Sequence, residues 1–344
     1  MPVRLQCGIR VARLASLASI AAVAIAGCGG GSGPAAAAAP RTIVWGAGTE
    51  IDFPIYEEAG SLLTSHGITL NYQLVGPTAA MSGFEKGKLA FVAADGSPPS
   101  PVALAAIRRG SAVSLPVARW GVAMIYDVPG LRVRLKLDGK TLANIFTGKV
   151  TTWDNREIAR QNPGVRLPAL AIKVVERKDP SVETELLTRY LAASSRHWRR
   201  SIGVGDRVRW PGGTADVGDA NVVRSVALVR GAIGYTEQTE VLQTRIAAAA
   251  LRTTSGAYVA PTLSSTTTGT YPLIANAYVL TYRDLCDAGL TATETDAAER
   301  FLAYLLGPGQ GVVKRLSFSP LPARVRARAL AEVRRLTCGS QPIA

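Results

Sequence analysis

Cys28 is the residue of this 344-residue chain whose surroundings predict a covalent modification. It directly follows Ile25-Ala26-Gly27, and a cysteine behind small residues at the end of a leader is what a lipoprotein signal peptidase cleaves. The leader begins basic and continues as an apolar run over residues 14–25, as secretion signals do. We therefore expect residues 1–27 to be removed and Cys28 to carry a diacylglycerol that anchors the exported chain at the cell membrane or periplasmic face. An ordinary secretion signal with an incidental cysteine is the alternative, and the run is too short for a transmembrane helix.

Two other cysteines predict a bridge. Cys7 leaves with the leader and Cys28 takes the lipid, so Cys286 and Cys338 remain in an oxidising compartment. A disulfide closing about 50 residues would constrain the unfolded chain by about 4 kcal/mol. Two separately buried thiols are the alternative. No cysteine or histidine spacing in the sequence is typical of a metal site, so no metal or cofactor is expected.

Enzyme motifs are incomplete in this sequence. Gly139-Lys140-Thr141 ends like a phosphate-binding loop, but Arg134 stands where that loop needs its first glycine. The two histidines, His66 and His197, lie outside any nucleophile or HExxH arrangement, and His197 is expected on a helix surface. Trp153 and Trp210 are expected to serve packing and not ligand stacking. A hydrolase is therefore poorly supported, and we expect no enzyme.

The distribution of basic residues argues against nucleic acid as a partner. The formal net charge is +14, and it stays at +11 once the three leader arginines are gone, because 36 basic residues then face 25 acidic ones. A nucleic-acid-binding surface would cluster its basic residues with aromatics, whereas here the arginines are scattered and the aromatics few. A basic surface favours anions or acidic envelope components, or is simply solvated. We expect a monomer that binds no nucleic acid.

The sequence predicts strands and helices that alternate along the chain and would position a site. Short apolar or β-branched runs ending near glycine alternate with stretches of helical periodicity, which predicts parallel sheet flanked by helices, with the loops after the strands at one edge. Expected strands are 42–45, 70–74, 89–94, 117–128, 171–175, 231–235 and 276–282, and expected helices start at Pro54 or span 140–147, 156–160, 180–191, 297–306 and 323–336. Residues 28–40 are expected to be a flexible tether, and residues 253–269 a long surface connection.

The order of these segments resembles that of the PstS-type phosphate-binding proteins of ABC importers, a periplasmic-binding-protein family. The resemblance runs from about residue 42 to about residue 336 and is carried by these quoted segments: Gly46-Ala47-Gly48 with Pro54 and Tyr56, Asn71-Tyr72-Gln73 with Gly76, Phe91-Val92-Ala93-Ala94-Asp95, residues 137–149, Trp153-Asp154, Asn162-Pro163-Gly164, Arg177, Asp179-Pro180-Ser181 and residues 231–235. It implies an α/β fold with two lobes, a two-stranded hinge and one ligand in the cleft between the lobes. Lobe I would comprise 41–118 and 271–344, and lobe II 119–270, with crossings near Ala118 and Thr270.

The resemblance also implies a ligand set without a metal. Arg177 would supply the counter-charge to the anion and Ser181 a hydroxyl, while helix N-termini would add N–H donors. Asp95 would accept the proton of a bound phosphate, which excludes sulfate. A salt-bridged surface arginine is the alternative for Arg177. A permease in the membrane would receive the ligand.

Three positions depart from that ligand set. Glu50 stands where the family has a threonine, Pro77 where it has a serine, and Val182-Glu183 where it has Gly-Thr. A carboxylate about 4 Å from one phosphate charge is repelled by about 4 kcal/mol, or about three decades of affinity. Tight phosphate binding therefore requires Glu50 and Glu183 to turn away, to be protonated, or to pair with Arg177 or Lys178.

Neighbouring hydroxyls offer a milder interpretation. Thr49, Thr78 and Thr184 each lie one residue from a position where the family has a hydroxyl, so loop shifts would bring them to the anion. Three hypotheses follow: an oxyanion importer with phosphate as its first ligand, an envelope interaction or sensory protein that has lost phosphate affinity, and a protein for a ligand with both cationic and anionic groups. Phosphate titration separates the first two, and a screen of amino compounds tests the third.

Overall fold

The computed structural model describes residues 41–87, 89–96, 100, 104–105, 107, 112–339 and 341–342. The predicted leader, the lipidation site at Cys28 and the tether lie outside these residues. Within them, no helix has the length and apolarity that crossing a bilayer requires. Residues from Pro40 to Ala344 form one compact unit, and the description below concerns that unit.

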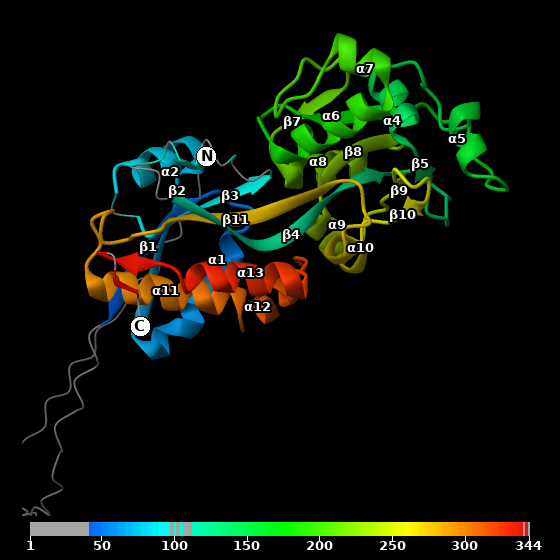
Figure 1. Cartoon of the computed structure of the whole chain (residues 1–344). Coiled ribbons are helices and arrows are strands. Elements are labelled where there is room, and N and C mark those ends of the chain that lie inside the picture. Colours follow the sequence, from blue (N-terminus) through cyan, green and yellow to red (C-terminus); the bar gives the residue numbers. More distant parts are fainter. Residues whose placement is uncertain are drawn as a thin grey trace, which may run out of the picture. The chain divides into compact units, whose positions relative to one another are not determined.

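The backbone of the fold is a mixed sheet in which one strand serves two lobes. Its order is β2-β1-β3-β11-β4-β8-β6-β7. Strand β4 (Ala112–Tyr126) pairs with β11 as far as Gly121 and with β8 from Val122 onwards, so it runs from lobe I into lobe II (Figure 1). Strand β11 (Ile274–Tyr282) brings the chain back beside it, antiparallel. The boundaries expected after residues 118 and 270 stay a prediction.

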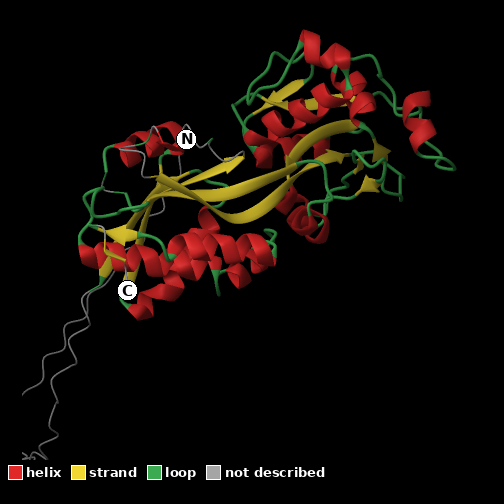
Figure 2. Ribbon diagram, viewed as in Figure 1, coloured by secondary structure: helices red, strands yellow, loops and turns green. Residues whose placement is uncertain are grey.

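Lobe I is a sheet between helices. Strands β2, β1 and β3 are parallel, and β11 is antiparallel to β3. Helices α1, α11, α12 and α13 cover one face and α2 the other (Figures 1 and 2). The elements are β1 (Thr42–Gly48), α1 (Phe53–Leu63), a 3-10 turn (Thr64–His66), β2 (Ile68–Leu74), α2 (Gly76–Glu85), β3 (Phe91–Gly96), α11 (Ala292–Leu306), α12 (Gln310–Arg315), α13 (Ala323–Val333), β12 (Thr337–Cys338) and β13 (Gln341–Pro342).

Lobe II repeats the layering. Strands β8, β6 and β7 are parallel, and β4 is antiparallel to β8. One face carries a core of Phe146, Leu187, Trp198 and Tyr235, and a valine-rich cluster around α8 fills the other. The elements are β5 (Lys136–Leu137), α4 (Gly139–Phe146), α5 (Arg156–Gln161), β6 (Lys173–Arg177), α6 (Val182–Ser194), α7 (Arg196–Ser201), β7 (Thr214–Asp216), α8 (Asp219–Leu228), β8 (Ala232–Glu237), α9 (Gln238–Thr244), β9 (Ala250–Arg252), β10 (Tyr258–Val259) and α10 (Leu263–Thr268).

Glycine at the end of β1 is required by close packing. A Cβ on Gly48 would lie 2.4 Å from the carbonyl oxygen of Ala93 and 2.4 Å from the hydroxyl of Tyr72. Backbone on the neighbouring strand cannot give way as a flexible side chain can, so only glycine lets β1 approach β3 this closely. The turn after β1, which carries Thr49 and Glu50, is thereby held against the end of β3.

The expectation of a surface connection over residues 253–269 was wrong for its second half. This segment contains β10 and the helix α10, whose Ser265 and Thr266 side chains are buried. Thr262 caps this helix: its hydroxyl accepts from Ser265 N, and the Ser265 hydroxyl accepts from Thr262 N. Serine and threonine have weak helix propensity, but reciprocal capping and burial offset it here. The expected disulfide is confirmed, with Cys286 and Cys338 bonded at a Cα–Cα distance of 4.8 Å.

Candidate functional site

Arg177 is the centre of a charged cluster at the carboxyl end of β6. Its Nε and Nη2 donate to the two oxygens of Asp179 at 3.0 and 2.5 Å, and its Nη1 donates to Asp219 Oδ2 at 2.9 Å. The side chain is 8% exposed. Both partners lie near the start of a helix. Asp179 is in the loop before α6, and Asp219 is in the first turn of α8. Arg177 is therefore neither a surface arginine nor an uncommitted cation.

Ser181 is the N-cap of α6. Its hydroxyl accepts a hydrogen bond from Thr184 N at 3.1 Å, and it lies 2.9 Å from Thr184 Oγ1. The Thr184 hydroxyl also contacts Tyr235 OH at 2.7 Å and is fully buried. These two hydroxyls stabilise the start of the helix, and Thr184 serves the lobe core rather than an exposed site.

Glu183 is buried beside Arg177. Its side chain is 1% exposed, and its Oε2 lies 3.6 Å from Arg177 Nη1, an ion-pair distance but not a hydrogen bond. Neither carboxylate oxygen has a hydrogen-bond partner among the described residues. Burial and, to a smaller extent, the charge of Asp219 raise the pKa of Glu183 to about 8, while Arg177 opposes the shift. Lys178, the other predicted partner, is exposed.

Two more carboxyls join this cluster without having been predicted. Asp219 Oδ1 accepts from Thr236 Oγ1 at 2.9 Å and from Glu237 N at 3.1 Å. Glu237 ends β8, is 8% exposed, and has an Oε1 without a hydrogen-bond partner among the described residues. Burial raises its pKa well above the ordinary value, and Asp219, Glu183 and Asp95 add to the rise. The sequence signals that could have identified these two residues were their positions, Asp219 at the start of a helix and Glu237 at the end of a strand. In an α/β fold both kinds of position lie at the carboxyl edge of the sheet, where ligands bind.

Asp95 is the last residue but one of β3 in lobe I, and it accepts hydrogen bonds from two neutral donors. Its Oδ2 accepts from Thr49 Oγ1 at 2.6 Å, and its Oδ1 accepts from Trp120 Nε1 at 2.9 Å. Burial raises its pKa to about 6, although both hydrogen bonds lower it. The hydroxyl of Thr49, a predicted ligand group, is thus committed to Asp95 in this state.

Asp52 is a second buried carboxyl that the sequence reasoning missed. Its Oδ2 accepts from the hydroxyl of Tyr56, and Thr49 Oγ1 lies 3.3 Å from its Oδ1. Burial raises its pKa well above the ordinary value, and the charge of Asp95 raises it further. Thr49 therefore stands between two carboxyls that cannot both be charged at low cost.

The remaining predicted positions do not join the cluster. Glu50 is exposed in the turn after β1, and Thr78 is exposed on α2. Pro77 lies at the start of the same helix and, as a proline, has no N–H to offer. Of the two acidic departures from the family, the structure therefore buries Glu183 beside Arg177 and leaves Glu50 in solvent.

The first turn of α6 lies close both to the end of β3, which carries Asp95, and to Arg177. A Cβ on Gly96, the last residue of β3, would lie 3.3 Å from Val182 Cγ1, and Glu183 follows next to Arg177. The charge of Asp95 also acts on Glu237. The carboxyl ends of β3, β6 and β8 thus bring Asp95, Arg177 and Glu237 to one region. Among the described residues, no group of three or more histidines, cysteines or acids is arranged to hold a metal ion.

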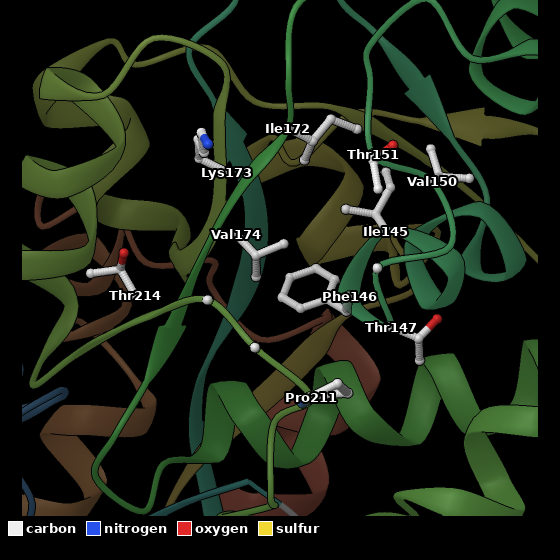
Figure 3. Close-up of a pocket in the computed structure, with 13 residues that line it drawn as sticks. Ile145, Phe146, Thr147, Val150, Thr151, Ile172, Lys173, Val174, Pro211 and Thr214 are labelled. Atoms are coloured by element: carbon white, nitrogen blue, oxygen red, sulfur yellow. The ribbon is translucent and has the colours of Figure 1, made fainter.

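A separate cavity of about 360 Å³ lies at the other end of β6. Its lining includes Ile145, Phe146 and Val174, whose side chains face one another in Figure 3. Lys173 is its basic residue, at the first position of β6, whereas Arg177 is at the last. Ile145, Phe146 and Val174 make one wall of the cavity apolar. None of the predicted ligand residues lines it.

Comparison with known proteins decides the family. Residues 33–308 match the PBP superfamily domain. The phosphate-binding protein PstS 3 of Mycobacterium leprae is 31% identical over 296 residues, which cover 76% of this chain and 78% of that protein. The chain is a member of the PstS family. PstS of Xylella fastidiosa (strain Temecula1 / ATCC 700964) is 26% identical over 314 residues, or 84% of each protein.

Solved structures agree with this assignment at the level of the fold. An ABC-type phosphate transport receptor from Vibrio cholerae superposes with a TM-score of 0.58 at 17% identity, covering 81% of this chain and 100% of that one. The periplasmic-binding-protein fold expected from the sequence is thereby confirmed. The PstS family consists of binding proteins, so the prediction that the chain is not an enzyme is confirmed as well.

Proposed function

We propose that this PstS-family protein is the exported, lipid-anchored component of an ABC importer that binds phosphate and delivers it to a membrane permease as a monomer. The observation that carries the proposal is the approach of the end of β3, where Gly96 follows Asp95, to Val182 in the first turn of α6, whose Glu183 lies beside Arg177. These groups supply a proton acceptor, a cation and a helix N-terminus for one small oxyanion. The names of the relatives, phosphate-binding proteins, support phosphate as that oxyanion.

Calorimetric titration tests the ligand. Phosphate should release heat with saturation at micromolar to millimolar concentration, and sulfate, which has no proton for Asp95, should not compete. An Asp95→Asn variant should lose most of this discrimination because an amide can donate to sulfate. Folded protein that gives no heat with millimolar phosphate between pH 5.5 and 9 would exclude phosphate as the ligand.

Membrane anchoring is tested separately. Cells that produce the protein should retain it in the membrane fraction, and a Cys28→Ser variant should appear in the soluble periplasm or the medium. Metabolic labelling with a fatty acid should mark the original chain and not the variant. Equal membrane retention of both would exclude the lipid anchor and leave the phosphate test unaffected.

One observation favours a second candidate, a ligand that carries a cationic group beside its anionic one. Arg177 is shared by Asp179, Asp219 and Glu183, so the cluster holds more carboxyls than cations. An ammonium group would pair with Glu183, which no hydrogen bond satisfies. A thermal-shift screen with amino acids and aminophosphonates tests this candidate, and the absence of any stabilisation would exclude it.

A further inference from the structure

Glu183 is set apart from the acids near it because both of its carboxylate oxygens lack a hydrogen-bond partner among the described residues, whereas Glu237 and Glu176 each lack one for a single oxygen. Asp52 accepts from Tyr56, Asp95 accepts from Thr49 and Trp120, and Asp219 accepts from Arg177 and Thr236. Glu183 is 1% exposed, and neither of its oxygens has a hydrogen-bond partner among the described residues. A buried polar group left in this way costs about 1–3 kcal/mol, and more if charged, so a partner is expected when the site is filled.

The charges around Glu183 do not support an ionised carboxylate. Its neighbours are Arg177 from β6, Asp219 from α8, Glu237 and Tyr235 from β8, and Ser181 at the helix cap. All three guanidinium nitrogens of Arg177 donate to Asp179 or Asp219. These two carboxylates together carry one negative charge more than Arg177 neutralises. A third carboxylate would add to that excess in a buried place.

A bound anion would be repelled by an ionised Glu183. Each ionised carboxylate about 4 Å from the anion would repel it by about 4 kcal/mol at an effective dielectric near 20. A neutral carboxylic acid at the same place has one O–H to donate instead. Burial raises the pKa of Glu183 to about 8 although Arg177 opposes the shift, and this agrees with a group that keeps its proton at neutral pH.

We propose that Glu183 is a specificity-determining residue that stays neutral in the filled site and donates its carboxylic O–H to the bound oxyanion. This inference rests on the proposed function. It replaces a repulsive contact by a hydrogen bond at the helix start beside Arg177, and it makes the proton on Glu183 a condition for binding. The proton remains on Glu183 throughout, so no group is transferred.

Phosphate dissociation constants measured by calorimetry from pH 5.5 to 9 test the proposal. Glu183→Gln keeps a permanent neutral donor of nearly the same shape, so the ratio of the dissociation constant of the original protein to that of the variant cancels the titration of phosphate itself. We expect a ratio near one at pH 6 that rises at least about tenfold by pH 9. Glu183→Ala, which has no donor, should bind about tenfold or more weakly than Glu183→Gln at pH 6.

Glu185→Gln is the matched control. Glu185 lies in the same helix turn, pairs with Arg189 and is partly exposed, so its ratio should stay flat with pH. A flat ratio for Glu183→Gln as well, in folded protein that binds phosphate, would overturn the inference and leave the proposed function standing. Absence of phosphate binding in the original protein and in Glu183→Gln at every pH would instead defeat the proposed function.

A measurement without variants guards against misfolding of the mutants. The side-chain carboxyl carbon of Glu183, labelled with carbon-13, reports its protonation directly by NMR. In the phosphate complex at pH 7 we expect the chemical shift of a neutral acid. The shift of a carboxylate in that complex would overturn the inference.

Discussion

Arg177 and Asp219 form a 2.9 Å ion pair that joins the end of β6 to the start of α8. The pair leaves no guanidinium nitrogen of Arg177 without a carboxylate partner, since the other two donate to Asp179. In the proposed site, a bound anion would therefore share this cation with acids already in contact with it. Its affinity would depend on how many of those acids remain charged.

Replacing Asp219 by asparagine should strengthen phosphate binding. The amide oxygen can still accept from Thr236 Oγ1 and Glu237 N, while one partly buried negative charge beside Arg177 disappears and Arg177 Nη1 loses its acceptor. We expect a gain of about tenfold or more, which corresponds to about 1.4 kcal/mol. Calorimetry at pH 7 measures it. An unchanged or weaker affinity, with an unchanged melting temperature, would contradict this account of the cluster.

The stability of the ligand-free protein should fall as pH rises. Glu183 has a pKa of 4.5 when exposed and about 8 in the folded protein, so between these values the unfolded chain loses a proton that the folded chain keeps. The free energy of unfolding then decreases with pH in that window, by about 1.4 kcal/mol per unit for each such group. Urea denaturation from pH 4.5 to 8.5 should show a shallower decrease for Glu183→Gln. The same slope in both proteins would mean that Glu183 is already ionised when folded.

The disulfide should contribute about 4 kcal/mol to stability, because it closes a loop over a sequence separation of 52. The double variant Cys286→Ser, Cys338→Ser should lose this amount in urea denaturation. The original protein under reducing conditions should behave like the variant. A reductant effect that persists in the double variant would point to another thiol.

Glycine at position 48 should tolerate no side chain. Gly48→Ala forces a methyl group against the Ala93 carbonyl oxygen and the Tyr72 hydroxyl, and we expect a loss of about 1–3 kcal/mol. Gly212→Ala is the control, because nothing lies within 4 Å of the place that its new methyl group would take, and its effect should stay within about 0.5 kcal/mol. Equal stabilities of the two variants would show that β1 and β3 can separate without cost.

The fold was largely predictable because its signals are local or familial. Apolar runs ending at glycine marked β1, β3 and β8, and helical periodicity marked α1, α6 and α11. Where the local signal failed, another interaction decided the outcome. The serine and threonine run of α10 forms a helix because Thr262 and Ser265 cap it and the lobe buries two of its hydroxyls.

The site was less predictable because its chemistry depends on distances through space. Arg177, Asp95 and Ser181 could be named from the resemblance, and their role as ligands stays a prediction. The partnership of Arg177 with Asp219 joins residues 42 positions apart, and no spacing rule foretells it. Asp52 was hidden for a different reason: only the folded turn shows that its carboxyl turns inward to Tyr56 and Thr49.

Strand β4 passes from pairing with β11 to pairing with β8 without an interruption, and β11 starts opposite Gly121, where that change occurs. Strand β4 is thus one continuous strand through the crossing, and not a loose linker. A solute that drew the lobes together would have to bend or twist this strand.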